Sequence, residues 1–351
     1  MKIGLIGLAG SGKTTVFNAV TGLDATIGSI GGDRTRPNLG MARVPDARVD
    51  RLSEMYTPKK TIYSEVTFVD LPGRLPGSGE GGLDPLAVQH IQDMDALTLV
   101  IRAFDNPILS EAQDALRDVS AFEDELLLTD MVVLEGRVNR LRKPGKGDPE
   151  LKLLERCLEA IEEGQPLRQI SFSPEEERQL SGYRFLTQKP AMVLYSAGDD
   201  DVGQPPPGEF SAECETRKLP VLAMAGRVEM EIAQLDEEEQ GEFLADLGLE
   251  AGARDRFIRA TYDLLDRICF LTVGPDEVRS WEIRRGTVAV KAAGKVHSDI
   301  ERGFIRAEVM SYEDLVTLGS EQACKEKGKA RLEGKTYVMQ DGDVVDYRFN
   351  V

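Results

Sequence analysis

The chain has 351 residues, with 43 basic and 61 acidic side chains, a formal net charge of −18, and 41% hydrophobic content. This composition excludes a disordered chain, and the acidic balance excludes a general attraction to polyanions, so nucleic acid would need a local basic patch. No apolar run reaches the roughly 18 residues of a membrane helix, and the four cysteines form no CxxC pair. We expect a cytoplasmic protein with reduced cysteines and no membrane partner.

The chain begins with an apolar run that breaks into glycines. The segment Lys2–Gly7 predicts a buried strand, and a helix is predicted from Lys13 through Val20. Between them, GLAGSGKT (7–14) satisfies GxxxxGK[ST] in the required context, after a strand and before a helix. Glycines let successive N–H groups turn inward and the helix N-terminus adds positive charge, so the loop is shaped for phosphate oxygens.

This loop predicts a site for ATP or GTP with Mg²⁺ as cofactor. Lys13 would hold the β- and γ-phosphates and act in catalysis, and the Thr14 hydroxyl would ligate the metal. The predicted nucleotide contacts in the loop are Ala9, Gly10, Ser11, Gly12, Lys13, Thr14 and Thr15. The alternative is a plain glycine turn with a solvated lysine.

A second motif, DLPG (70–73), ends the strand predicted at Glu65–Asp70. A P-loop NTPase needs a carboxylate here to position Mg²⁺ and a glycine N–H to sense the γ-phosphate, so we assign Asp70 to the metal and Gly73 to the nucleotide. Arg74 follows directly, and an arginine there would neutralise charge developing on the γ-phosphate. We assign it a catalytic role; a side chain directed into solvent is the alternative.

Three further strands are predicted at Leu97–Phe104, Ala191–Ala197 and Pro220–Gly226. Near-continuous apolar strands separated by helical or loop segments predict an α/β fold with a parallel sheet covered on both faces. Such sheets bind ligands at the carboxyl ends of their strands.

Helical patterns interrupt this sheet. A heptad seam is predicted to form an antiparallel helical coiled coil, broken by KPGKGDP (143–149), through Leu127, Met131, Leu134, Val138, Leu141, Leu151, Leu154, Leu158 and Ile161. SPEE (173–176) then predicts a helix with a serine cap, proline at its first position and glutamate three residues after the cap. After about Ile268, short alternating segments with one helix around Gln322–Lys329 predict a compact α+β module.

Taken together, these residues resemble the YchF/Obg-like ATPase family over essentially the whole chain. The resemblance rests on the loop at 7–14, DLPG, VPDARVDRL (44–52), YRFLTQKP (183–190), AAGKVHSDIERGFIRAEV (292–309) and RLEGKTYVMQDGDVVDYRFNV (331–351). It implies a Ras-like P-loop NTPase domain at 1–117 and 186–267, a coiled-coil insertion at 118–185, and a C-terminal ubiquitin-like (β-grasp, TGS) α+β domain at 268–351. It also implies ATP preferred over GTP, slow hydrolysis, and association with ribosomes or RNA.

The chain departs from the family's pattern at the base end of the site. The base-recognition motif Asn-x-x-Glu reads Ser196-Ala-Gly-Asp199 here, so the choice between ATP and GTP stays open. A solvated turn without base contact is the alternative to a real recognition motif. We assign Ser196 and Asp199 to nucleotide binding, together with Ala225 and Gly226 after the last predicted strand.

Two further departures concern hydrolysis. Ser110 stands where the family carries a histidine proposed to act in hydrolysis, and a neutral serine is no base near pH 7, so turnover should be slow. The first switch, Thr-x-x-Pro-Asn-x-Gly in the family, is one residue shorter here. We assign its Thr35 to the metal.

The leading hypothesis is a slow Mg²⁺-dependent NTPase that acts as a nucleotide-dependent switch linked to ribosomes or RNA. The alternative is a nucleotide-gated ribosome- or RNA-binding protein, or a scaffold, with little or no hydrolysis. Its candidate contacts would be Arg279, Trp281, Arg284, Arg285 and Arg306. A small-molecule kinase is a third hypothesis, but the sequence shows no acceptor site.

Overall fold

The structure is a computed structural model. It describes residues 1–26, 37–72, 83, 85–106, 109, 112–142, 149–246, 249 and 251–350. The chain forms two compact units: a first unit of Met1–Ala42 with Thr67–Phe257, and a second unit of Arg43–Val66 with Ile258–Val351. Among the described helices, none is long and apolar enough to cross a membrane.

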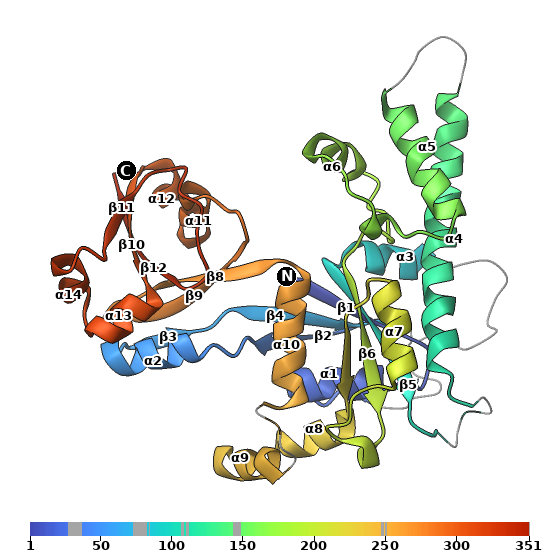
Figure 1. Cartoon of the computed structure of the whole chain (residues 1–351), viewed down its shortest axis with the longest axis horizontal. Helices are drawn as coiled ribbons and strands as arrows, with labels where there is room; N and C mark the ends of the chain where they lie inside the picture. Colours follow the sequence, from blue (N-terminus) through green and yellow to red (C-terminus); the bar gives the residue numbers. More distant parts are fainter. Residues whose placement is uncertain are drawn as a thin grey trace. The chain divides into compact units, whose positions relative to one another are not determined.

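The first unit is built on a six-stranded sheet with the strand order β2-β4-β1-β5-β6-β7 (Figure 1). The pairs β1/β4, β1/β5, β5/β6 and β6/β7 are all parallel, which confirms the predicted parallel sheet. The five predicted strands are present, and the sequence pattern did not predict β2. The strands are β1 (Lys2–Ile6), β2 (Asn38–Arg43), β4 (Glu65–Asp70), β5 (Ala96–Ala103), β6 (Ala191–Ala197) and β7 (Val221–Met224).

Helices cover both faces of this sheet (Figure 1). On one face, Ile91, Phe122 and Phe210 from three helices pack against Leu99 and neighbouring strand residues. On the other, the rings of Phe68 and Phe257 lie 5.4 Å apart. The first face carries α3 (Pro85–Gln92), α4 (Ala115–Leu141) and α7 (Gly208–Thr216); α1 (Lys13–Thr21), α8 (Gly226–Ile232), α9 (Glu237–Asp246) and α10 (Ala253–Leu264) complete the helices around the sheet.

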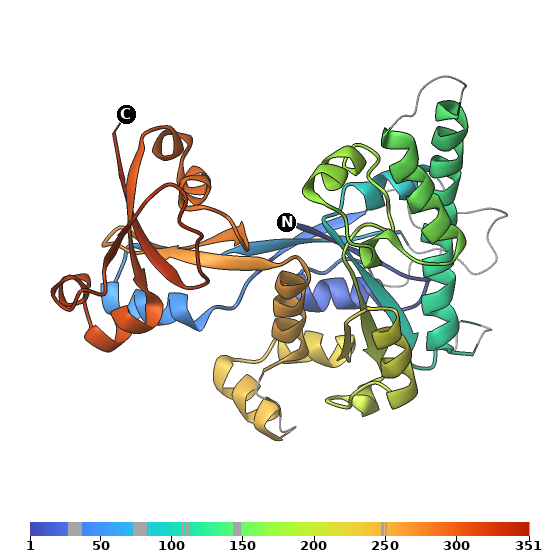
Figure 2. The same ribbon diagram turned by 45° about the horizontal axis from the view of Figure 1, so that its top comes forward.

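A helical hairpin extends from the first face of the sheet. Helices α4 and α5 (Pro149–Glu162) lie side by side in both views (Figures 1 and 2). One hydrophobic cluster joins them, and all nine predicted seam residues belong to it or pack against it: Leu127, Met131, Leu134, Val138, Leu141, Leu151, Leu154, Leu158 and Ile161. Because α4 is a continuous helix of 27 residues whose first turns pack on the sheet, sheet and hairpin share one rigid element.

The chain returns from the hairpin to β6 through a buried polar anchor. The Asp130 carboxylate on α4 accepts hydrogen bonds from the Leu186 N–H at 2.9 Å and from the Thr187 N–H and hydroxyl at 2.7 Å. Burial raises the pKa of Asp130, so these donors hold the carboxylate against a desolvation cost. Upstream, the helix predicted at SPEE is confirmed as α6 (Pro174–Leu180), with reciprocal hydrogen bonds between Ser173 and Glu176.

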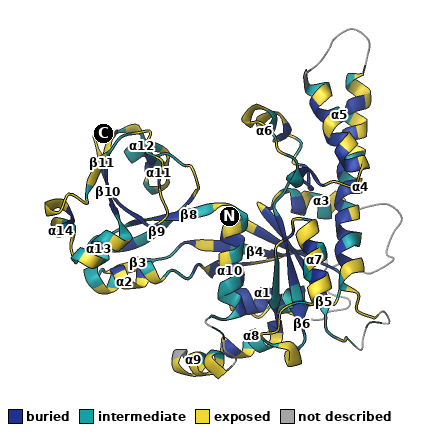
Figure 3. Cartoon of the chain, viewed as in Figure 1, coloured by how far each residue is buried: buried dark blue, intermediate teal, exposed yellow. Residues whose placement is uncertain are grey.

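The second unit contains a mixed sheet with the order β11-β10-β12-β8-β9-β3. Its central strands carry most of the buried residues, whereas β3 and β11 at the two edges are mostly exposed (Figure 3). The sheet lies between two hydrophobic clusters, and the neighbouring residues Phe270 and Leu271 belong to different ones. The strands are β3 (Lys60–Ile62), β8 (Arg267–Thr272), β9 (Glu277–Arg284), β10 (Phe304–Ser311), β11 (Arg331–Glu333) and β12 (Asp343–Phe349), and the helices are α2 (Ala47–Tyr56), α11 (Ala289–Val296), α12 (Ser298–Arg302), α13 (Tyr312–Leu318) and α14 (Glu321–Glu326).

The expectation of one helix in this C-terminal region was wrong. The structure has α14 near the predicted position, but it also has α11, α12 and α13. These helices have only eight, five and seven residues, too few for a clear 3.6-residue period in the sequence. The segment Arg43–Val66, which carries α2 and β3, belongs to this unit as well.

The hairpin cluster should carry much of the stability of α4 and α5. Leu134 is fully buried in it, so Leu134→Ala should lower the free energy of unfolding by about 3 kcal/mol through lost contacts and a cavity. Val132 lies on the same helix but is 63% exposed, so Val132→Ala is the matched control, with an expected change within about 0.5 kcal/mol. Urea unfolding followed by circular dichroism at 222 nm measures both; equal losses would contradict the seam assignment.

Candidate functional site

The carboxyl ends of five parallel strands meet at one edge of the first sheet. The loop after β1 lies there, with Asp70 at the end of β4 and Ser196 near the end of β6. Strand β1 is central, with β4 and β5 on either side, so its loop is flanked by the ends of both neighbours. The first sheet therefore brings together segments as far apart in the chain as Gly7 and Ser196.

The loop between β1 and α1 has a backbone that only glycine adopts easily. Gly10 and Gly12 have φ angles of 79° and 94°, in the left-handed region. A Cβ atom on Gly12 would lie 2.6 Å from the Ser196 hydroxyl oxygen, so a larger residue would be excluded there. Ser196 is 3% exposed, and its side chain thus packs directly against the loop.

The Lys13 side chain is folded into this loop. Its ammonium donates hydrogen bonds to the carbonyl oxygens of Gly7 at 2.9 Å and Leu8 at 2.8 Å, and the residue is only 6% exposed. Burial lowers the pKa of Lys13 from 10.5 to about 8, while the charge of Asp70 raises it in part. The ammonium is therefore incompletely neutralised, and an anion brought into the loop would stabilise its charged form.

A carboxylate and a hydroxyl lie next to the lysine in a geometry suited to a divalent cation. The Thr14 hydroxyl donates to Asp70 Oδ2 at 2.7 Å, and the Asn38 amide donates to the same oxygen at 3.2 Å. Asp70 Oδ1 is buried, and so is the Ser11 hydroxyl; neither has a hydrogen-bond partner among the described residues. A buried carboxylate oxygen left without a partner fits a Mg²⁺ ligand, since Mg²⁺ binds oxygen ligands together with substrate phosphates.

The other end of the site is formed by the segments that follow β6 and β7. Ala225 is the N-cap of α8, and a Cβ on Gly226 would lie 3.4 Å from Thr15 Cγ2, so this turn packs against α1. Asp199 is partly exposed and forms an ion pair with Arg227, whose side chain is 72% exposed. The predicted residues Ser196, Ala225 and Gly226 thus lie against the loop or the start of α1, with Asp199 at the solvent side.

Two family matches cover most of the chain. The family described as "50S ribosome-binding GTPase" (MMR_HSR1) matches residues 2–134, and YchF-GTPase_C, described as "Protein of unknown function (DUF933)", matches residues 267–350. Relatives that are similar over the whole chain bear the same family name. The "Ribosome-binding ATPase YchF" of Bacillus subtilis is 37% identical over 364 residues, covering 100% of both chains, and that of Escherichia coli O157:H7 is 37% identical over 360 residues, covering 100% of this chain and 99% of the relative.

The chain belongs to the YchF family. Among solved structures, the Schizosaccharomyces pombe YchF GTPase superposes with a TM-score of 0.85 at 31% identity, covering 99% of this chain and 97% of that one. The resemblance found in the sequence is thereby confirmed, and so is the Ras-like P-loop domain with mixed α/β sheets.

Some of the predicted YchF site residues lie outside the described residues. These are Thr35 of the first switch, Gly73 and Arg74 of the DLPG segment, and Ser110 at the position of the family histidine. The candidate RNA contacts lie in the second unit, where several have intramolecular partners. Arg279 lies 3.9 Å from the centre of the Trp281 ring, and Arg285 pairs with Asp266 at 2.9 Å.

Sequence reasoning missed two residues that the structure adds to this YchF site. Asn38 lies in the first switch, three residues after Thr35, but its hydrogen bond to Asp70 was not predicted. Arg227 was not considered, although it directly follows Gly226, and it is the partner of Asp199. Both contacts join segments that are distant in sequence. The only sequence signal was that Asn38 lies in the first switch and that Arg227 follows Gly226.

The low pKa of Lys13 predicts a pH dependence of triphosphate binding. Polyphosphate binds the ammonium form, so above pH 8 binding requires proton uptake, and affinity at pH 9 should be about tenfold weaker than at pH 7. Titration of a fluorescent non-hydrolysable triphosphate with Mg²⁺ between pH 7 and 9.5 measures this. Lys13→Gln removes the titrating group and should give weak binding that is flat over this range; a flat profile in the wild type would contradict the assignment.

Proposed function

We propose that this YchF family member binds a purine nucleoside triphosphate in the loop at 7–14 and hydrolyses its γ-phosphate slowly. The observation that carries the proposal is the buried, incompletely neutralised ammonium of Lys13 inside a glycine loop, beside a carboxylate with an oxygen that has no partner among the described residues. The relatives named "Ribosome-binding ATPase YchF" support hydrolysis. A site of this kind accelerates phosphoryl transfer mainly by positioning and charge neutralisation.

Each residue has a defined part in this proposal. Lys13 leaves the Gly7 and Leu8 carbonyls to hold the β- and γ-phosphates, while the N–H groups from Ala9 to Thr15 surround the phosphate chain. Thr14, Asp70 and Thr35 would hold Mg²⁺, which neutralises phosphate charge when bound. Gly73 would sense the γ-phosphate through its N–H.

The hydrolytic step lacks an obvious base. Ser110 stands at the position of the family histidine and does not take up a proton near pH 7, so we propose slow turnover. Arg74 would supply positive charge to the transition state from its position after DLPG.

The base end of the site suggests a mixed specificity. A carboxylate alone matches guanine, whose N1 and N2 groups both donate, whereas adenine presents one donor and one acceptor. The Asp199–Arg227 pair offers an acceptor beside a donor, so we propose that it admits adenine as well as guanine. The buried Ser196 hydroxyl would add a contact between the base end and the loop.

The remaining architecture is proposed from the family resemblance. We propose an NTPase domain at 1–117 and 186–267, a coiled-coil insertion at 118–185 supported by the α4/α5 cluster, and a β-grasp TGS domain at 268–351. The compact unit that contains the last also takes in Arg43–Val66. We further propose a cytoplasmic protein that binds ribosomes or RNA according to its nucleotide state, as the names of the relatives support.

Single-turnover hydrolysis tests the function. Lys13→Ala should abolish phosphate release and weaken triphosphate binding, because the phosphates lose their cation.

Arg74→Ala should slow the single-turnover rate with unchanged affinity; an unchanged rate would remove this arginine from the mechanism. Wild-type protein that binds triphosphate but releases no phosphate would favour the alternative of a nucleotide-gated binding protein.

Titrating labelled ATP and GTP tests the base assignment. Arg227→Ala leaves Asp199 as a lone acceptor and should shift the ratio of affinities toward GTP by about five- to tenfold, roughly the value of one hydrogen bond. Arg178→Ala is the control, because Arg178 is an exposed arginine of the first unit that pairs with Glu175 on α6. A ratio unmoved by Arg227→Ala would place the pair outside the base site.

A further inference from the structure

The sheet of the second unit opens along one strand. On one edge, β12 pairs with β10 over its whole length, from Phe349 opposite Phe304 to Asp343 opposite Ser311. On its other edge, the pairing with β8 has a single register pair among the described residues, Val344 with Leu271. The rest of that edge, from Val345 to Phe349, therefore has backbone N–H and C=O groups that no strand of the described chain pairs with.

A cavity of ≈ 430 Å³ lies along this open edge. Strand β8 ends at Thr272 and turns through Val273, Gly274 and Pro275, and these residues form the wall opposite β12. The volume is within the range of ligand sites, roughly 300–1,000 Å³. We call the space between β12 and the 272–275 segment the β12 slot.

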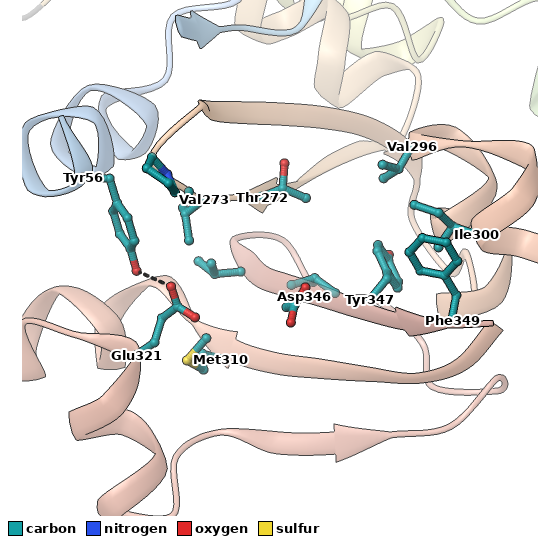
Figure 4. A pocket seen from close by; sticks show the side chains of 14 residues that line it. Tyr56, Thr272, Val273, Val296, Ile300, Met310, Glu321, Asp346, Tyr347 and Phe349 are labelled. Carbon is teal, nitrogen blue, oxygen red and sulfur yellow. Dashed lines mark hydrogen bonds between the residues drawn. The ribbon is translucent and has the colours of Figure 1, made fainter. Parts of the chain in front are cut away.

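The β12 slot has apolar subsites on both faces of the sheet. Figure 4 shows Val296, Ile300 and Phe349 together at one end, with Tyr56 and Glu321 at the other. Met310 lines the slot near Glu321, on the face that the other hydrophobic cluster covers. Side chains of an extended strand alternate between the two faces of a sheet, so apolar subsites on both faces suit a strand rather than a compact molecule.

The charge of the slot is negative. Its lining includes two carboxylates, Glu321 and Asp346, and the described part of the chain adds no basic side chain to it. Glu321 accepts a hydrogen bond from the Tyr56 hydroxyl at 3.0 Å, whereas Asp346 is exposed and has neither a hydrogen bond nor an ion pair within the described chain. A negative slot repels nucleic acid phosphates and attracts a chain that carries Lys or Arg.

We propose that the β12 slot binds an extended peptide with alternating apolar and basic residues, which adds as a strand to the open edge of β12. Main-chain hydrogen bonds to β12 supply affinity. The apolar side chains of the peptide lie on the face of Val296, Ile300 and Phe349, and Asp346, on the opposite face, pairs with a Lys or Arg of the peptide. This goes beyond the proposed function, because neither the nucleotide nor its hydrolysis takes part.

The fluorescence of one tryptophan can report binding in the β12 slot. Trp281 is the single tryptophan, and its indole N–H donates at 2.9 Å to the hydroxyl of Thr272, a slot residue. Three blocked octapeptides without aromatic residues serve as probes, with valine alternating with lysine, serine or glutamate. Binding to the full-length protein is followed by its tryptophan fluorescence. The lysine peptide should bind most tightly, then the serine peptide, then the glutamate peptide, and the preference for the lysine peptide should shrink as salt is added.

Variants of the protein test the charge contact. Asp346→Asn should weaken the lysine peptide by roughly threefold and leave the serine peptide unchanged, as expected for an exposed ion pair. Asp266→Asn is the matched control, an exposed aspartate just before β8, and should change nothing. Equal binding of the lysine and glutamate peptides would overturn the proposal. So would the absence of a response to any peptide at concentrations up to 1 mM, where a dissociation constant of 1 mM corresponds to a binding free energy of about −4 kcal/mol.

Modified peptides test strand addition itself. N-methylation of one alternate set of peptide amides removes the donors that face β12 and should abolish binding, whereas methylation of the other set should be tolerated. Tolerance of both sets would overturn strand addition.

A fluorescence response to single-stranded oligo-uridine that Phe349→Ala removes would assign the slot to RNA and overturn the peptide proposal.

Discussion

The ammonium of Lys13, buried among backbone carbonyls, is the interaction on which the site depends. Burying a cation is costly unless it is paired, and here two neutral carbonyls and the nearby Asp70 compensate only in part. The loop can surround the lysine only because Gly10 and Gly12 adopt left-handed backbone angles. The free protein thus keeps a buried charge that an anion entering the loop would stabilise.

The parallel sheet makes this arrangement possible. Five of its strands, β4, β1, β5, β6 and β7, run parallel, so the loop after β1, the carboxylate that ends β4 and the turns after β6 and β7 meet at one edge. Glycine at position 12 admits the Ser196 side chain against the loop. Rigid α4 packs on the same sheet and continues into the hairpin, so the hairpin is held by the core that positions the site.

The second unit uses a different physical feature. Among the described residues, its mixed sheet leaves one edge of β12 open beyond Val344. The site of the first sheet is instead built from loops at the ends of strands. Backbone groups on an open edge recognise extended chains without demanding a particular sequence, and the carboxylate of Asp346 adds a preference for basic ones. The proposed nucleotide site and the β12 slot therefore lie in separate compact units of this chain.

The sequence by itself determined the features whose signals are local. The glycine loop with Lys13, the five apolar strands and the hairpin seam all follow from short patterns, because the residues that make each feature are neighbours in the chain or repeat at a fixed period. Tertiary structure alone decided the partners of Asp70 and Asp199, which are Asn38 and Arg227, and the open edge of β12. These depend on strand order and register, and residue spacing within a segment does not encode how distant segments pack together.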